Sequence, residues 1–327
     1  MRVRMIKFNM APTARKLVNE VMAVKPGERA LIVTDSGRSP TITEALAQAV
    51  AGAGAELAIV HMSPRLMGGI DPPPHVSAAI HASDVVFLQL SYATFHTDTI
   101  RGALAGGTRT LEMWGFEEEM MVVGGANVDH AEMESISLKL TERLTRAKRG
   151  RMTTPEGSDI SFSLDGREGF ALLQTAHGPG EHCACPGGEA TICPVRGSAS
   201  GVLVSPFCIE HKDLGQISAP MRIEVKAGLA VSASGSPEGE RFWAILDEAG
   251  ELAKNVAEFA FGTNGACRKR VTVREAKKAM GTCHMAFGDS QSLAGEVNTP
   301  LHVDMIYDRP TVWLDDEMVM KDGNILI

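Results

Sequence analysis

Short apolar runs that alternate with helical patterns constrain the first half of this chain more than any other feature. The run Ala30–Thr34 is typical of a strand buried on both faces. Comparable runs fall at 56–60, 84–90 and 108–114, and helical patterns fall at 11–24, 39–53, 74–82, 97–105 and 130–148. Strands that alternate with helices in this way predict a parallel sheet covered by helices on both faces.

The pattern changes after about residue 150. Residues 151–164 predict a hairpin around Pro155-Glu-Gly, and further strands are expected at 201–205, 221–231 and 312–320. One helix is expected over 239–257, where apolar residues keep helical spacing. We therefore predict two domains, an α/β domain over residues 1–150 and an α+β, mostly antiparallel domain over residues 151–327.

Charge and composition exclude several classes of partner. The chain has 32 Lys and Arg against 40 Asp and Glu, a formal net charge of −8, and no dense basic stripe, which argues against nucleic acid. Apolar runs are too short to span a membrane, and the first residues lack the apolar core of a signal peptide. Six cysteines in 327 residues do not form a disulfide scaffold. We expect a cytoplasmic protein.

The segment Leu301–Tyr307 carries two candidate metal ligands. It is expected to be a strand, and side chains two positions apart on a strand share a face, so His302 and Asp304 point the same way. His284 lies within about twenty residues upstream and offers a second imidazole. Neutral nitrogen and anionic oxygen suit a divalent cation. The alternative is a partly exposed polar pair on an edge strand, because so short a motif often matches by accident.

Two glutamates occupy suggestive positions in the same half. Glu189 lies in the glycine-flanked segment Pro186–Pro194, which is expected to run from a loop into a strand. Glu258 is expected to close the helix over 239–257 and to enter a packed turn. The alternative for each is a solvent-facing carboxylate, which is the usual environment of glutamate.

The motifs around these five residues resemble the metal-dependent aminopeptidases of the aminopeptidase T type. They occur in the same order over residues 150–327, as PGGEATICP, AEFAFGTN, GTCHMAFGDS and LHVD. The resemblance implies one or two divalent ions (Zn, Co or Mn) held by Glu189, Glu258, His284, His302 and Asp304, with one carboxylate bridging. It also implies a homodimer that acts on a small molecule or short peptide. The expected reaction is hydrolysis of an amide by a metal-activated water.

The sequence departs from these peptidases at two positions. They carry a tyrosine seven residues after the histidine that matches His284, where this chain has Gln291. They also carry a glutamate five residues before that histidine, where this chain has Ala279. We expect Gln291 to donate a hydrogen bond on the oxyanion side of the site. The missing carboxylate weakens or removes one metal position.

Two alternatives remain open. The chain also resembles, in length and in the LHVD motif, the 2,5-dihydroxypyridine 5,6-dioxygenases of the same superfamily, which use one Fe(II) and have a histidine where this chain has Glu258. The other alternative is a relative that binds metal or ligand without turnover.

Two further groups of residues lie close to these motifs. The group His182, Cys183, Cys185 and Cys193 could bind zinc or act as a redox pair, but incidental thiols explain its spacing better. Asp289 and Ser290 could orient a metal ligand.

Overall fold

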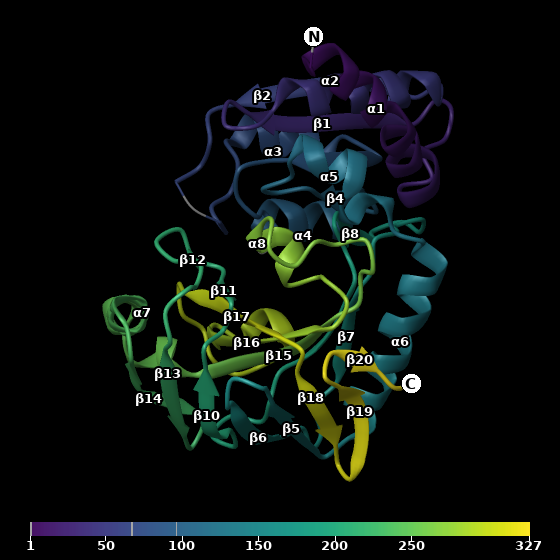
Figure 1. Ribbon diagram of the computed structural model, residues 1–327. Helices are drawn as coiled ribbons and strands as arrows, with labels where there is room; N and C mark the ends of the chain where they lie inside the picture. The colour runs from purple at the N-terminus through teal and green to yellow at the C-terminus, as the bar shows by residue number, and fades with distance from the viewer. Residues whose placement is uncertain (1, 67, 96) are drawn as a thin grey trace. The chain divides into compact units, whose positions relative to one another are not determined.

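The computed structural model describes residues 2–66, 68–95 and 97–327, which form two compact units (Figure 1). Unit 1 contains the chain up to His130 and the segment Leu173–Gly187, and unit 2 contains Ala131–Leu172 and Gly188–Ile327. The structure thus divides the chain near residue 130 rather than at residue 150. The reason is that Leu140 and Leu144, in the helix that follows, are buried in the core of unit 2.

Unit 1 is built on a parallel five-stranded sheet with the order β2-β1-β3-β4-β8. Its strands are β1 (Arg29–Asp35), β2 (Glu56–Met62), β3 (Val85–Gln89), β4 (Arg109–Glu112) and β8 (His182–Ala184). Its helices are α1 (Arg2–Lys16), a π-helical turn (Leu17–Val21), α2 (Pro40–Gly52), α3 (Pro74–His81), α4 (Asp98–Ala105), α5 (Glu118–Val123) and a 3₁₀ turn (Gly125–Asn127). The sequence did not predict β8 or α5.

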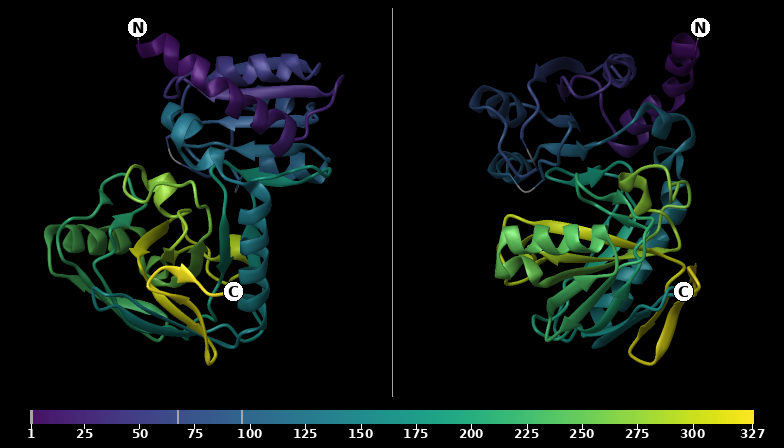
Figure 2. Two further views of the ribbon diagram at one scale, coloured as in Figure 1. Left: turned by 45° about the vertical axis from the view of Figure 1, so that its right-hand side comes forward. Right: turned by 60° about the vertical axis from the view of Figure 1, so that its left-hand side comes forward.

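Helices cover both faces of this sheet, as the sequence predicted (Figure 2). On one face Ile32 and Phe87 pack in a cluster with residues of α1, α2 and α5. On the other face Val33 and Leu88 pack with residues of α3 and α4. Alternate residues of β1 and β3 therefore enter different apolar clusters, which explains why these strands are apolar throughout.

Unit 2 contains two antiparallel sheets. Their orders are β14-β13-β10-β6-β5-β18-β19-β20 and β12-β11-β17-β16-β15-β9-β7. The strands of the first are β5 (Arg149–Thr153), β6 (Asp159–Ser163), β10 (Ser200–Val204), β13 (Arg222–Lys226), β14 (Leu229–Ser234), β18 (Thr311–Leu314), β19 (Glu317–Lys321) and β20 (Asn324–Ile325). Those of the second are β7 (Gly169–Leu172), β9 (Glu189–Ile192), β11 (Cys208–Ile209), β12 (Gly215–Gln216), β15 (Val256–Gly262), β16 (Thr282–Gly288) and β17 (His302–Asp308).

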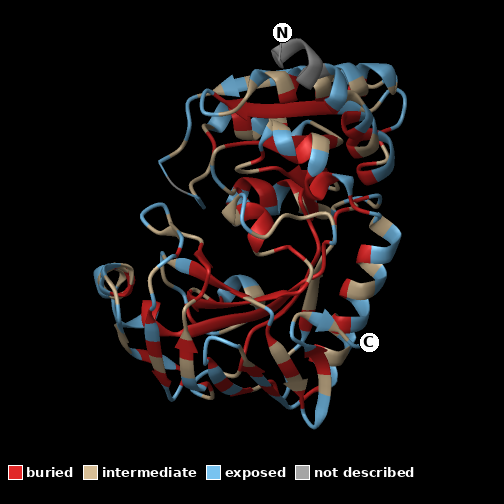
Figure 3. Ribbon diagram, in the orientation of Figure 1, coloured by how far each residue is buried: buried red, intermediate tan, exposed pale blue. Residues whose placement is uncertain are grey.

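One apolar core joins the two sheets of unit 2 (Figure 3). Met152 and Phe162 of the first sheet share this core with Phe259, Met285 and other residues of the second. The helices of the unit are α6 (His130–Arg146), α7 (Pro237–Ala249) and α8 (Val273–Ala276), with 3₁₀ turns at Glu251–Lys254 and Gln291–Leu293. The predicted α+β, mostly antiparallel character of this half is confirmed.

The prediction of a helix over 239–257 is wrong for residues 250–257, because α7 ends at Ala249. Gly250 follows α7 with φ +95°, a conformation that glycine adopts readily and that stops the helix. Residues Val256–Gly262 are instead a strand, and every one of them is buried. The small and aromatic residues of this segment fit a strand with both faces covered, a pattern that helical spacing alone does not distinguish from a buried helix.

Among the described residues, no helix combines the length and the apolar character that crossing a membrane requires.

Candidate metal centre

Four adjacent strands of the second sheet bring the five predicted ligands together in unit 2. In the register of these strands, Ala286 of β16 lies opposite Glu258 of β15 on one side and opposite Asp304 of β17 on the other. The small side chain of Ala286 therefore separates two carboxylates that belong to the same face of the sheet. His302 starts β17, His284 lies in β16, and Glu189 starts β9 opposite Gly262 of β15.

A β-bulge places Glu258 on this face. Val256 pairs with Phe287, but Glu258 pairs with Ala286, so one extra residue stands between them. Without it, Glu258 would fall on the same face as Val256, which packs in the apolar core. The bulge therefore allows β15 to bury aromatic residues on one face and to present a carboxylate on the other.

The ligand atoms form two groups of three that share Glu258. One group contains Glu189, Glu258 and His284, and the other contains Glu258, His302 and Asp304. Within each group the atoms that could bind a metal lie within 4.8 Å of one another. We call them the buried triad (Glu189, Glu258, His284) and the open triad (Glu258, His302, Asp304), because the His302 side chain is 32% exposed and His284 is 1% exposed.

The open triad is set up to hold a cation. Nδ1 of His302 donates to the backbone carbonyl of Asp289 at 2.8 Å, which directs Nε2 toward Oε2 of Glu258 at 3.0 Å and Oδ1 of Asp304 at 3.2 Å. Oδ1 of Asp304 is buried, and its close polar contact among the described residues is with Nε2 of His302. Thr191 donates to Oε1 of Glu258 and fixes that carboxylate.

The carboxylates of the open triad favour a positive charge beside them, as the pKa shifts of His302 and Glu258 show. Burial alone would lower the pKa of His302, but hydrogen bonds with Asp304 and Glu258 raise it well above its usual value. Burial alone would raise the pKa of Glu258, but the two histidines hold it below its usual range. A proton on His302 therefore compensates these carboxylates without a metal, and a metal ion would displace that proton.

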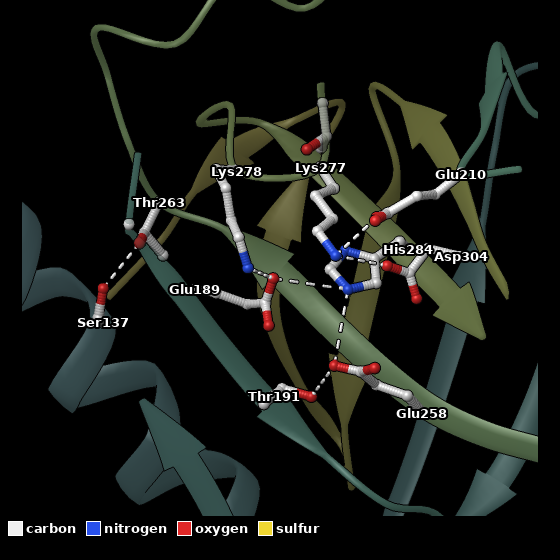
Figure 4. A network of polar contacts seen from close by, with 12 residues as sticks. Ser137, Glu189, Thr191, Glu210, Glu258, Thr263, Lys277, Lys278, His284 and Asp304 are labelled. Atoms are coloured by element: carbon white, nitrogen blue, oxygen red, sulfur yellow. Dashed lines mark hydrogen bonds and ion pairs between the residues drawn. The ribbon is translucent and has the colours of Figure 1, made fainter. Parts of the chain in front are cut away.

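Two lysines that sequence reasoning missed, the partly exposed Lys277 and the buried Lys278, also contact this cluster (Figure 4). Nζ of Lys277 lies 2.8 Å from Oδ2 of Asp304 and 2.6 Å from Oε2 of Glu210. Nζ of Lys278 contacts Oε2 of Glu189. Burial would lower the pKa of Lys277, but Asp304 and Glu210 raise it above its usual value. Burial lowers the pKa of Lys278, and Glu189 opposes that shift.

The charges that contact one another directly leave an excess of negative charge in the cluster. Four carboxylates face two ammonium groups, so two negative charges stay uncompensated when both histidines are neutral. The guanidinium of Arg274 is also buried and acts electrostatically on both lysines. Oxygen and imidazole nitrogen donors, together with a buried carboxylate oxygen that faces His302, fit a divalent cation in the open triad.

The remaining predicted residues lie outside the two triads. Gln291 begins a 3₁₀ turn, is exposed, and accepts a hydrogen bond from Asn298 at 2.9 Å. It therefore makes no described contact with the five ligands, and its proposed oxyanion role gains no support. Asp289 does orient a ligand, through its backbone carbonyl. Ala279 is buried in the segment that carries the two lysines.

The cysteines do not form a metal site among the described residues. None of the six is part of a disulfide in the described part of the chain, and Cys183 and Cys185 pack in an apolar cluster of unit 1. Cys193 belongs to unit 2, where burial raises the pKa of its thiol. Cys283 points into the core from the face of β16 opposite His284, as the alternation of the strand predicts.

A family model for 2,5-dihydroxypyridine 5,6-dioxygenase (NicX) matches residues 13–327. The chain is also similar to the solved structure of 2,5-dihydroxypyridine dioxygenase from Pseudomonas putida KT2440. That match has a TM-score of 0.81 at 16% identity and covers 97% of this chain and 96% of that one. The structure of wild-type AmpT from Thermus thermophilus matches with a TM-score of 0.70 at 15% identity, over 98% and 100% of the two chains. No curated protein matches.

The family match defines an enzyme of the dioxygenase class, and the chain shares its fold with AmpT, the relative that the sequence motifs indicated. Within this class, the chain belongs to the family of 2,5-dihydroxypyridine 5,6-dioxygenases. The comparisons therefore favour the alternative of the sequence analysis over its main prediction of an amide hydrolase.

Proposed function

We propose that this protein is a metal-dependent dioxygenase that opens a hydroxylated pyridine or a related aromatic ring. The open triad would hold one Fe(II) between Glu258, His302 and Asp304. The observation that carries the proposal is the pairing of a family match over almost the whole chain with a cation-ready triad on one sheet face.

The protein's own residues prepare this centre. The carbonyl of Asp289 fixes the tautomer of His302, Lys277 holds one oxygen of Asp304, and Thr191 fixes Glu258. These contacts hold Nε2 of His302 and Oδ1 of Asp304 3.2 Å apart, so that one ion could bind to both. Fe(II) bound there would supply a redox-active centre for dioxygen and for a ring hydroxyl.

Access to the triad is from the side of His302. Its side chain is 32% exposed, whereas those of Glu258 and Asp304 are 7% and 2% exposed. A small planar substrate would approach past this imidazole. Glu258 distinguishes the set from the two-histidine, one-carboxylate sites of many Fe(II) oxygenases, because it adds a second negative charge to the centre.

A metal-dependent amide hydrolase is the second candidate. The observation that favours it is that Glu258 belongs to both triads, as a carboxylate that bridges two metal ions would. The similarity to AmpT supports only the shared fold.

Oxygen consumption separates the two candidates. The protein should be reconstituted with Fe(II) under anaerobic conditions and then assayed in aerated buffer. Addition of a hydroxylated pyridine should then cause dioxygen consumption and loss of the ring absorbance. Asp304→Asn should abolish both signals. Lys269→Met is the matched control, because Lys269 pairs with Asp308 outside the triads and should keep activity. Amide hydrolysis with Zn, Co or Mn and no oxygen uptake on any ring would refute the dioxygenase. Ligand binding without product under every metal would refute both enzymes.

A further inference from the structure

A lysine outside the buried triad contacts one of its carboxylates and supplies positive charge there. Nζ of Lys278 contacts Oε2 of Glu189, and the same oxygen lies 3.6 Å from Nε2 of His284 (Figure 4). Nε2 of His284 is also 3.6 Å from Oε1 of Glu258. The ammonium group therefore already compensates the carboxylate that would have to bind a metal in this triad.

The two histidines differ in the support that their second nitrogen receives. Nδ1 of His302 has the carbonyl of Asp289 as a partner, whereas Nδ1 of His284 is buried without a hydrogen bond. If Nε2 of His284 bound a metal, its Nδ1–H would be an unpaired buried donor, which is unfavourable. Both observations disfavour a metal ion in the buried triad and leave the open triad unaffected.

We propose that the side chain of Lys278 replaces a second metal ion and sets the number of metal ions in this protein to one. The buried triad is a latent cation site in which this single side chain already neutralises one of the two carboxylates. The side chain of Lys278 is 1% exposed and that of Glu189 is 4% exposed, so solvent does not screen their pairing. A second divalent ion could bind only after the ammonium group had left Glu189.

The role of Lys278 rests on the metal centre proposed above in the open triad. The number of metal ions bound per chain tests the two proposals separately. Wild-type protein stripped of metal and dialysed against Mn²⁺ should retain about one ion per chain, since Mn²⁺ accepts the same oxygen and nitrogen donors. Lys278→Met removes the charge at similar length and should retain about two ions per chain, because Glu189, Glu258 and His284 then resemble a three-ligand metal site. Lys269→Met is the matched control and should stay at about one ion.

Two further variants make the result specific. Lys278→Met combined with Glu189→Gln should return to one ion, because the latent site loses a ligand. Glu189→Gln alone should keep one ion, with affinity lowered by less than about tenfold, because Glu189 does not belong to the open triad.

The outcomes are distinct. One ion in the wild type and one in Lys278→Met would overturn the role of Lys278 alone. Two ions in the wild type would also overturn it, and none in the wild type would overturn the metal centre and with it this role. If Lys278→Met does not fold, the Glu189→Gln variant tests the proposal instead. If Glu189→Gln bound no metal ion, Glu189 would be a ligand of the single ion, and the proposal would be refuted.

Discussion

Replacement of Lys277 by methionine should destabilise metal-free unit 2 strongly. The ammonium group lies 2.8 Å from Asp304 and 2.6 Å from Glu210, and the Lys277 side chain is only 14% exposed. With an effective dielectric constant of about 20, each contact has a Coulomb energy of roughly 6 kcal/mol. Desolvation of the three charges offsets much of this sum, and breaking a buried ion pair costs about 3–5 kcal/mol in practice.

We therefore expect Lys277→Met to lower the free energy of unfolding by about 3–5 kcal/mol in the presence of a chelator. In a unit of this size that corresponds to a fall in the melting temperature of about 10 °C. Urea titrations followed by tryptophan fluorescence would measure it, because Trp243 and Trp313 both lie in unit 2. A divalent ion should restore part of the loss, since it compensates Asp304 in place of the ammonium group.

Lys269→Met supplies the control for this measurement. Lys269 pairs with Asp308 at 2.7 Å, but its side chain is 35% exposed, so removal should cost no more than about 1 kcal/mol. If Lys277→Met were no more destabilising than Lys269→Met, the ion pairs around Asp304 would not stabilise the metal-free protein, and the reasoning would be refuted.

Three other perturbations test separate parts of the account. Glu258→Gln should weaken divalent metal binding by more than about a hundredfold, because it removes a ligand rather than an outer partner, and calorimetric titration would show no change if Glu258 were only structural. Gly288→Ala should cost more than about 3 kcal/mol in urea unfolding, because its Cβ would lie 2.0 Å from the carbonyl oxygen of Leu301 and its φ is +110°. Burial lowers the pKa of His130 to about 4, so the unfolded chain binds an extra proton below about pH 6.5 and stability falls as the pH drops toward 4. Wild type should therefore lose about 1–2 kcal/mol more than His130→Asn over that range, allowing for partial exposure, and equal losses would contradict the shift.

The sequence predicted those parts of the site that depend on strand alternation. The alternation predicts His302 and Asp304 on one face of a strand, and the structure has this arrangement, with Val303 and Met305 of the same strand in the apolar core. Period-two alternation is a local property of an extended chain and needs no tertiary information. The parallel sheet of unit 1 was predictable for the same reason, since each buried strand is a separate apolar run.

Glu258 shows where local patterns fail. Its segment was assigned to the end of a helix because its apolar spacing fits both structures, and the strand is stabilised by neighbours distant in sequence. The bulge that turns Glu258 to the site depends on register with β16, which the sequence does not reveal.

The two lysines could not be assigned from sequence, although one signal was present. Lys277 and Lys278 are adjacent charged residues within a segment whose neighbours Ala276 and Ala279 are small and buried. Lysine is almost never buried without a partner, so a surface position was the natural expectation. Their partners Glu189 and Glu210 lie more than sixty residues away, and only the folded sheet brings them together.

The position of the metal ion tests the central claim most directly. Crystals of the protein soaked in Mn²⁺ should show one anomalous scattering peak per chain, bounded by Nε2 of His302 and by carboxylate oxygens of Glu258 and Asp304 at about 2.0–2.3 Å. Lys278 should still contact Glu189 in that crystal. A peak between Glu189 and His284, or no peak among these strands at saturating Mn²⁺, would contradict the account.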